Sequence, residues 1–208
     1  MVIKKEVKVY STVCESRSLG LSLDEEKVLA ALSYFVHLAN NRLDKYKAAK
    51  LMYLFDREMF LKTGMPAFFG EFFSLEHGPI VSEINDIMNS CSPDSLDTKY
   101  SASSFFSLDN NTLSVIQDLG DEYTRLLSEE ERDVMNDLFV TFKNSNFGDL
   151  KRYMHSLPET IELENGKKRE KITYFHFLKK NGFSDDQIDD ILSEIEYEMK
   201  LRELISVK

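Results

Sequence analysis

The fold of this chain is decided by one stretch in its first third, which reads DKYKAAKLMYLFDREMFL from Asp44 to Leu61. Its apolar residues recur at the three- and four-residue spacing of a helix. Asp44 suits the N-cap position, because its carboxylate can accept a hydrogen bond from a backbone N–H of the first turn. Gly64 and Pro66 follow at positions that end a helix. The stretch therefore predicts a helix apolar enough to lie at the centre of the molecule.

Another apolar helix is expected immediately before this one. Ser22 can cap it, while the side chain of Glu25 returns a hydrogen bond from the third position of the helix. The spacing of the apolar residues that follow predicts a helix over about 23–40. These residues are Val28, Leu29, Leu32, Phe35 and Val36.

The next segment is rich in aromatic residues. An aromatic run between residues 68 and 75, punctuated by Gly70, predicts a strand near 71–76. Gly78-Pro79 follows, and proline suits the first turn of a helix, because its missing N–H would be unbonded there. We expect this third helix to end near Ser90.

A hairpin and two more helices are expected in the middle of the chain. The turn sequence Asp109-Asn110-Asn111 lies between short apolar runs and predicts a hairpin, which could pair with the 71–76 strand. Ser128 with Glu131 forms the pattern of a capping box and opens a long helix. A shorter helix near 148–156 is expected to follow.

The last part of the chain begins with a charged segment. Residues 159–171 carry many charges and no apolar periodicity, so we interpret them as a loop. Beyond it we expect a helix near 172–180 and a final helix, opened by Ser184 with Gln187 as its reciprocal capping partner. The apolar stripe of that final helix either closes the core of the domain or offers a surface to a partner. The stripe consists of Ile188, Ile191, Leu192, Ile195 and Met199.

These elements predict a mainly α fold. We expect a compact helical domain with a small antiparallel β-sheet or hairpin, followed by a C-terminal helical appendage. Three parts are expected along the chain: an N-terminal arm over residues 1–20, the helical domain over 21–160 and the appendage over 161–208.

Composition argues against several functional classes. The 208 residues include 36 Asp and Glu against 26 Lys and Arg, a net charge of -10, which repels nucleic-acid phosphates and disfavours nucleic acid as a partner. The apolar runs are far shorter than the roughly 20 residues that cross a bilayer, so no membrane partner is expected. Cys14 and Cys91 lack CxxC spacing and flanking histidines, so we expect no disulfide scaffold, metal or cofactor. A cytoplasmic protein fits this composition best.

Motifs of catalysis are missing from the sequence. It contains no GxxxxGK[ST], GxGxxG, GxSxG or HExxH pattern. The histidines His37, His77, His155 and His176 lie far apart in the chain, so they could form an acid–base site only if the fold brought them together. His77 directly precedes Gly78-Pro79, where its ring could hold the turn through a backbone hydrogen bond or face a partner.

Several of these residues together resemble a known family. The segment Lys50 to Asp56 (KLMYLFD) is followed by Gly64 and Pro66, then by HGPIVSEI from His77, and later by Leu150, His155 and Pro158. In order and spacing this resembles the SocA-like, or Panacea, domain of bacterial toxin–antitoxin systems over roughly residues 26–160. Two positions depart from that pattern. Asn85 stands where the family often has an aromatic residue, and the tryptophan common near the closing proline is missing. The residues of this sequence that match the motif of the family are Lys50, Tyr53, Asp56, His77, Gly78, Pro79 and His155.

The resemblance implies a mostly helical antitoxin that neutralises a cognate protein toxin by direct binding, without enzymatic activity. Some family members resemble adaptors that deliver a toxin to a protease, so a proteolytic adaptor is an alternative. It would need a second docking surface, for which the arm at 1–20 or the helices beyond residue 172 are candidates. A third hypothesis is a hydrolase or nucleic-acid-modifying enzyme that uses His77 and His155, and it would need polar groups that converge in a pocket.

Overall fold

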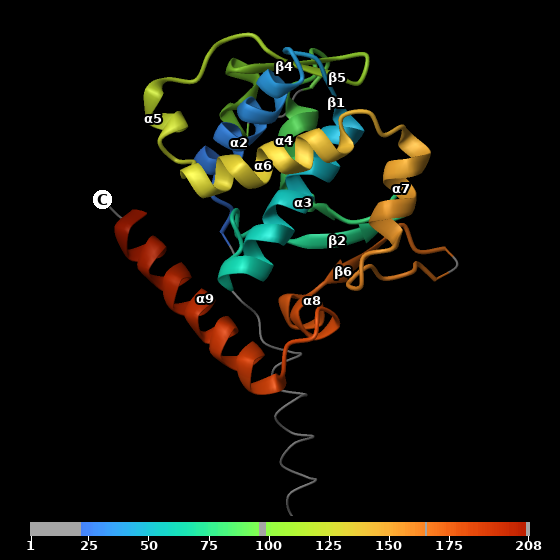
Figure 1. Cartoon of the computed structure of the whole chain (residues 1–208). Helices are drawn as coiled ribbons and strands as arrows, with labels where there is room; N and C mark the ends of the chain where they lie inside the picture. The colour runs from blue at the N-terminus through green and yellow to red at the C-terminus, as the bar shows by residue number, and fades with distance from the viewer. Residues whose placement is uncertain (1–21, 96–98, 165, 207–208) are drawn as a thin grey trace, which may run out of the picture.

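The structure is a computed structural model that describes residues 22–95, 99–164 and 166–206. Helices make up most of it (Figure 1), and two small antiparallel sheets lie among them, so the mainly α prediction is confirmed. The expected N-terminal arm lies outside the described residues. The helices are α2 (Glu25–Leu38), α3 (Lys45–Thr63), α4 (Ser82–Ser90), α5 (Asp121–Thr124), α6 (Glu129–Phe142), α7 (Phe147–His155), α8 (Tyr174–Lys180) and α9 (Asp185–Ser206), with a 3-10 turn η1 (Ser101–Ser104).

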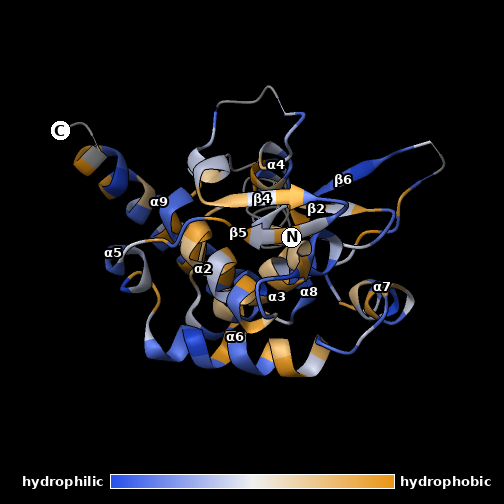
Figure 2. Ribbon diagram, turned by 90° about the horizontal axis from the view of Figure 1, so that it is seen from above, coloured by the Kyte–Doolittle hydropathy of each residue, from blue (hydrophilic) through white to orange (hydrophobic). Residues whose placement is uncertain are grey.

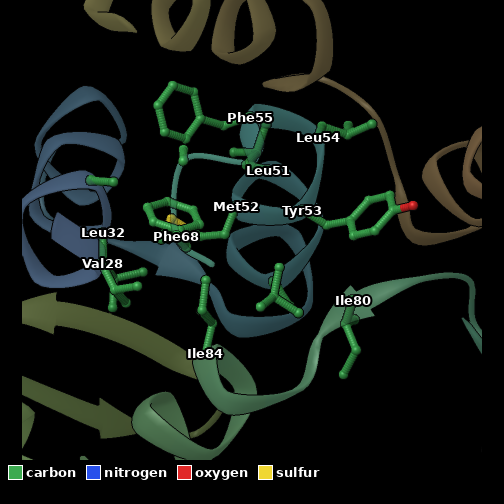
Figure 3. Packing of buried hydrophobic residues seen from close by; sticks show 14 of the residues in the cluster. Val28, Leu32, Leu51, Met52, Tyr53, Leu54, Phe55, Phe68, Ile80 and Ile84 are labelled. Carbon is green, nitrogen blue, oxygen red and sulfur yellow. The ribbon is translucent and has the colours of Figure 1, made fainter. Parts of the chain in front are cut away.

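Helix α3 runs through the middle of the molecule, with α2 and α6 on one side and strand β2 on the other (Figure 1). Every residue from Ala48 to Arg57 is buried, so this helix has no solvent-facing side over almost three turns. Figure 3 shows the consequence: side chains of successive residues point away from the helix in different directions, with Tyr53 on the side opposite Val28 and Leu32 of α2. The predicted central position is therefore confirmed.

The ends of α3 follow the predicted capping pattern. The Asp44 side chain accepts a hydrogen bond from the Lys47 backbone N–H at 2.9 Å. Gly64 adopts the left-handed conformation with φ of 75°, and its N–H donates to the Phe60 carbonyl at 2.9 Å. Glycine adopts this conformation without the steric penalty that a Cβ imposes, so it ends the helix in a single residue.

In the described part of the chain the strands form two three-stranded antiparallel sheets. One has the order β1-β5-β4 and the other β3-β2-β6. The first consists of β1 (Leu43–Asp44), β4 (Phe106–Asp109) and β5 (Thr112–Val115), and the second of β2 (Phe72–Leu75), β3 (Ile80–Val81) and β6 (Arg169–Ile172).

Two sequence predictions about strand pairing were wrong. The hairpin around Asp109–Asn111 forms as β4–β5, but it pairs with β1 through Leu43 and Leu113 and not with the 71–76 strand. Strand β2 has no free edge for it, because β3 and β6 occupy both sides. The charged segment 159–171 is not wholly a loop, since Arg169 to Ile172 pair with β2 as β6. Figure 2 shows β6 as mostly hydrophilic, which explains why the apolar pattern did not reveal it.

Two expected helix starts were also wrong. Helix α2 begins at Glu25 with Asp24 as its N-cap, whose side chain accepts from the Lys27 N–H at 3.1 Å, so the expected cap at Ser22 does not form. After Pro79 the chain first forms β3, because the β-branched Ile80 and Val81 pair with Phe73 and Phe72, and α4 begins only at Ser82. The capping boxes at Ser128 and at Ser184 are confirmed.

The C-terminal segment contributes to the same core. Phe177 of α8 stacks on Phe60 of α3, with ring centroids 4.9 Å apart and planes within 1°. The predicted stripe of α9 is buried at Ile188, Leu192, Ile195 and Met199, whereas Tyr197 and Leu204 are 66% and 72% exposed. One face of α9 therefore closes the core. The division of the chain at residue 160 stays a prediction.

No helix in the described ranges is both long and apolar enough to cross a bilayer.

Candidate functional site

The motif residues singled out in the sequence lie in three places of the fold. Lys50, Tyr53 and Asp56 are on α3, His77 to Pro79 form the turn between β2 and β3, and His155 ends α7. The fold joins the first and second groups directly through Lys50. Tyr53 and Asp56 lie in the core and make separate contacts.

Lys50 holds the turn between β2 and β3. Its side chain is buried, with 2% of the residue exposed, and its ammonium group donates hydrogen bonds to the carbonyls of Gly78 at 2.7 Å and Pro79 at 3.0 Å. The ring of Tyr46 lies 5.1 Å from the same ammonium. Burial lowers the pKa of Lys50 to about 7, because desolvation disfavours the charged form. The buried amine satisfies two carbonyls that would otherwise lack partners.

Gly78 is required by the shape of the turn. Its φ is 92°, as expected for a glycine at this turn, and a Cβ at this position would lie 2.5 Å from Cβ of Met154 in α7. Both the backbone conformation and the close approach of α7 therefore exclude a side chain.

His77 lies at the surface beside this turn, with its side chain about half exposed at 45%. Its carbonyl accepts a hydrogen bond from the Tyr46 hydroxyl at 3.0 Å, and its Nδ1 lies 3.1 Å from Nζ of Lys151. Its ring packs edge-on against Phe147 at 5.2 Å between centroids. The backbone of His77 thus fixes the turn, while its ring remains accessible.

His155 approaches the same turn from α7. Its Nε2 donates to the Glu76 carbonyl at 3.1 Å, and its Nδ1 lies 3.5 Å from Glu162. Both ring nitrogens therefore have protein partners. The arrangement positions α7 against the end of β2. The rings of His77 and His155 contact different groups, and only His77 lines the groove beside the turn.

A groove of about 800 Å³ lies beside the turn. The start of α3, the β2–β3 turn, the first turn of α4 and the beginning of α7 form its walls. Its lining is rich in amines, amides and aromatic rings, and its members include Lys45, Tyr46, Lys47, Lys50, His77, Asn85, Asn146, Phe147 and Lys168.

Phe147 is the most exposed aromatic side chain of this lining, with 50% of the residue accessible. Its ring lies 4.6 Å from the ring of Tyr46, between centroids. Tyr46, His77 and Phe147 form a contiguous aromatic surface, which we call the turn face. Sequence analysis missed Tyr46 and Phe147, because neither forms part of a recognisable motif.

A second polar cluster lies inside the protein around Glu159. This carboxylate is fully buried and accepts hydrogen bonds from the Tyr53 hydroxyl at 3.0 Å and from Nε of Arg57 at 2.7 Å. The Asn181 side-chain amide donates to its other oxygen at 3.1 Å. The cluster connects α3 to the segment after α7 and to the end of α8. Burial, with the nearby Glu159 charge, raises the pKa of Tyr53 well above its usual value.

The Asp56 side chain is fully buried and binds backbone groups of the segment that follows α3. One carboxylate oxygen accepts from the backbone N–H groups of Ala67 at 2.5 Å and Phe68 at 3.3 Å, so the side chain organises the segment after α3. The other oxygen has no hydrogen-bond partner among the described residues. Burial raises the pKa of Asp56 to about 7, since desolvation outweighs the two N–H groups that favour the carboxylate.

Within the described ranges, no group of three or more His, Cys, Asp or Glu side chains is placed to hold a metal ion.

Comparison with known families gives the decisive observation. Residues 49–159 match the family model described as antitoxin SocA-like, Panacea domain. The chain belongs to this family. All the predicted motif residues of the Panacea domain, from Lys50 to His155, lie within the matched range. Glu159, whose carboxylate is the centre of the buried polar cluster, is the last residue of that range. No curated protein and no solved structure matches the chain.

Membership in an antitoxin-like family suggests a toxin–antitoxin role, a protein toxin as partner and a non-enzymatic activity. The turn face and the groove lie largely inside the matched range, so they are the candidate surface for such a partner.

We expect a side chain at Gly78 to destabilise the protein more than one at Gly182. Both glycines have φ near 90°, but a Cβ at Gly182 meets nothing within 4 Å, whereas one at Gly78 meets Met154. Gly78→Ala should therefore lower the melting temperature by clearly more than Gly182→Ala, as measured by circular dichroism. Equal losses would show that α7 does not restrain the turn.

Removal of the Glu159 carboxylate should strongly destabilise the fold. Glu159→Ala removes the acceptor of the Tyr53 hydroxyl and the buried carboxylate paired with Arg57, and breaking a buried pair from one side typically costs about 3–5 kcal/mol. Urea denaturation measures this loss. Glu58→Ala is the matched control: Glu58 pairs with the same arginine at 2.8 Å, but its side chain is 41% exposed, so its loss should cost about 1 kcal/mol or less. Similar losses for the two variants would contradict the role of Glu159.

Asp56 should make stability depend on pH. Its pKa is raised from 3.8 in the unfolded chain to about 7 in the folded one, so the folded state binds more protons between these values. The stabilisation from this group is complete below a pH of about 4 and is lost as pH rises through 7. The melting temperature of Asp56→Asn, relative to wild type, should therefore increase from pH 5 to pH 8. The exposed Asp133→Asn should show a constant difference, and a constant difference at Asp56 would refute the assignment.

Proposed function

We propose that this Panacea domain is an antitoxin that neutralises a cognate protein toxin by direct binding at the turn face. Family membership supports the toxin–antitoxin role. The observation that carries the choice of surface is the half-exposed Phe147 ring, which lies against Tyr46 and His77. Aromatic residues at the centre of an interface typically contribute most of its binding energy.

The turn face is also rigid, which favours tight binding. Lys50 holds the carbonyls of Gly78 and Pro79, and the Tyr46 hydroxyl holds the carbonyl of His77. Three consecutive carbonyls of the turn are therefore fixed from α3. A surface that is ordered before binding loses less conformational entropy when a partner docks.

Co-expression with the protein encoded beside this chain tests the proposal. We expect the wild-type chain to restore growth and Phe147→Ala to lose most of this rescue, because it removes the exposed ring without disturbing the core. Val140→Ala removes a side chain of α6 that is 63% exposed and does not line the groove, and it should rescue like wild type. Thermal melts of all three proteins show whether they are equally folded.

The amount of toxin in the rescued cells distinguishes neutralisation from delivery to a protease. Direct neutralisation leaves the toxin present and bound, so it should co-purify with the antitoxin at unchanged abundance. A toxin that disappears in the presence of the chain would instead favour the proteolytic adaptor. Full rescue by a folded Phe147→Ala protein would exclude the turn face as the binding surface.

A further inference from the structure

The groove beside the turn face has the opposite charge from the protein as a whole. The chain carries a net charge of -10. The groove is nevertheless lined by Lys45, Lys47 and Lys168, and by only two carboxylates, Asp44 and Glu76. A fourth lysine of the lining, Lys50, is buried and its amine is bonded to the turn carbonyls. Asp44 is already engaged as the N-cap of α3.

The groove lysines form no direct ion pair with the described residues, although the charge of Asp86 acts on Lys45. Among the described residues, none of the four forms an ion pair, and the hydrogen bonds of three of them go to neutral acceptors. Lys45 donates to the Asn89 side chain, Lys47 donates to the Lys143 carbonyl at 2.8 Å, and Lys50 donates to the turn carbonyls. Elsewhere on the surface ion pairs are common, and Lys27, Lys62, Lys167, Lys171 and Lys179 each pair with a carboxylate.

Two of these lysines also lie where they weaken the fold. Lys45 and Lys47 are in the first turn of α3, which contains no acidic residue. The first turns of α2, α6 and α9 are acidic, as the helix dipole favours. Positive charge at the start of the central helix is therefore unfavourable for stability, and a local conflict of this kind is expected where function requires it.

Phe147 is the exposed apolar side chain of the groove, whose other apolar lining residues are buried or half-buried. Phe147 lines it and is half exposed, next to Tyr46 and His77. Its volume of about 800 Å³ is large enough for several side chains of a partner, but not for a folded element.

We infer that the groove receives an acidic segment of the toxin, which places its carboxylates against Lys45, Lys47 and Lys168 and an apolar side chain on Phe147. This inference rests on the proposed function and names the chemistry of the partner. Such charge complementarity would select toxins that carry an exposed acidic segment and would accelerate their association with this acidic antitoxin.

Charge reversal in the full-length chain tests the inference. The probe is the purified protein product of the adjacent reading frame, inactivated in its own active site, and its dissociation constant is measured by titration calorimetry. We expect Lys47→Glu with Lys168→Glu to weaken binding at least tenfold. Lys180→Glu with Lys200→Glu changes the net charge equally at exposed positions of α8 and α9, and should leave affinity within twofold of wild type. Wild-type affinity should also fall between 50 and 300 mM NaCl.

Stability measurements separate a loss of binding from a loss of fold. Lys47→Glu places an acid in the first turn of α3, so its melting temperature should equal or exceed that of wild type. Lower affinity together with equal or higher stability supports the groove as the binding site. If the Lys47 variant is less stable, Lys168→Glu alone, at an exposed position outside the helix, provides the test of affinity.

Competition identifies the anion that the groove accepts. Poly-L-glutamate should displace the probe from the wild-type protein, and a single-stranded DNA oligonucleotide of equal charge should not. Displacement by the DNA alone would overturn the inference in favour of phosphate binding. If the wild type rescues growth and binds the probe, but the charge reversals have no effect, the inference fails and the proposed function stands. If the wild type neither rescues nor binds, the proposed function itself fails.

Discussion

The structure depends on a constraint set by α3, a helix that is buried on all sides from Ala48 to Arg57 and nevertheless carries charged residues there. A buried charge is tolerated only when hydrogen bonds replace the water that it has lost. Each polar residue of this helix therefore has a fixed partner elsewhere in the chain. Lys50 binds the turn between β2 and β3, Asp56 binds the segment after α3, and Tyr53 and Arg57 bind Glu159. The surrounding elements are positioned by these bonds as much as by apolar contact.

This constraint explains how the candidate surface is held in place by a core helix. The Lys50 ammonium lies in the interior, but the carbonyls that it binds belong to a surface turn. Tyr46, one helical turn earlier, holds the preceding carbonyl and also supplies part of the exposed aromatic surface. Residues of the recognised motif thus act mainly by holding the turn, and the side chains that a partner could touch are their neighbours.

Sequence patterns predicted the parts of the structure that depend on local chemistry. The central helix, its caps at Asp44 and Gly64 and the capping boxes at Ser128 and Ser184 could be identified, because each depends on residues within a few positions of one another. The Gly78-Pro79 turn after the aromatic strand was likewise recognisable, although strand β3 and not a helix follows it. The family was recognisable because its motif residues are closely spaced within α3 and the turn.

Long-range pairing was not predictable in the same way. Strand β6 has three charged residues in four, so its pattern is that of a loop until β2 is known to lie beside it. The β4–β5 hairpin could not be assigned to β1 from the sequence, because the pattern did not show that β3 and β6 occupy both edges of β2. No sequence motif identified Glu159 as a buried residue that joins α3 to α8; it was notable only for following Pro158. Phe147, the first residue of a short helix, was likewise part of no motif.

The position of β2 between β3 and β6 has a consequence for the synthesis of the protein. Phe72 pairs with Val81, nine residues later, but also with Ile172, one hundred residues later. The central sheet therefore remains incomplete on one side until β6 has left the ribosome, and a pairing between such distant residues forms slowly. A nascent chain that already contains the whole family domain still exposes one edge of β2. During that interval the whole Panacea domain is present in the cell but has not yet finished folding.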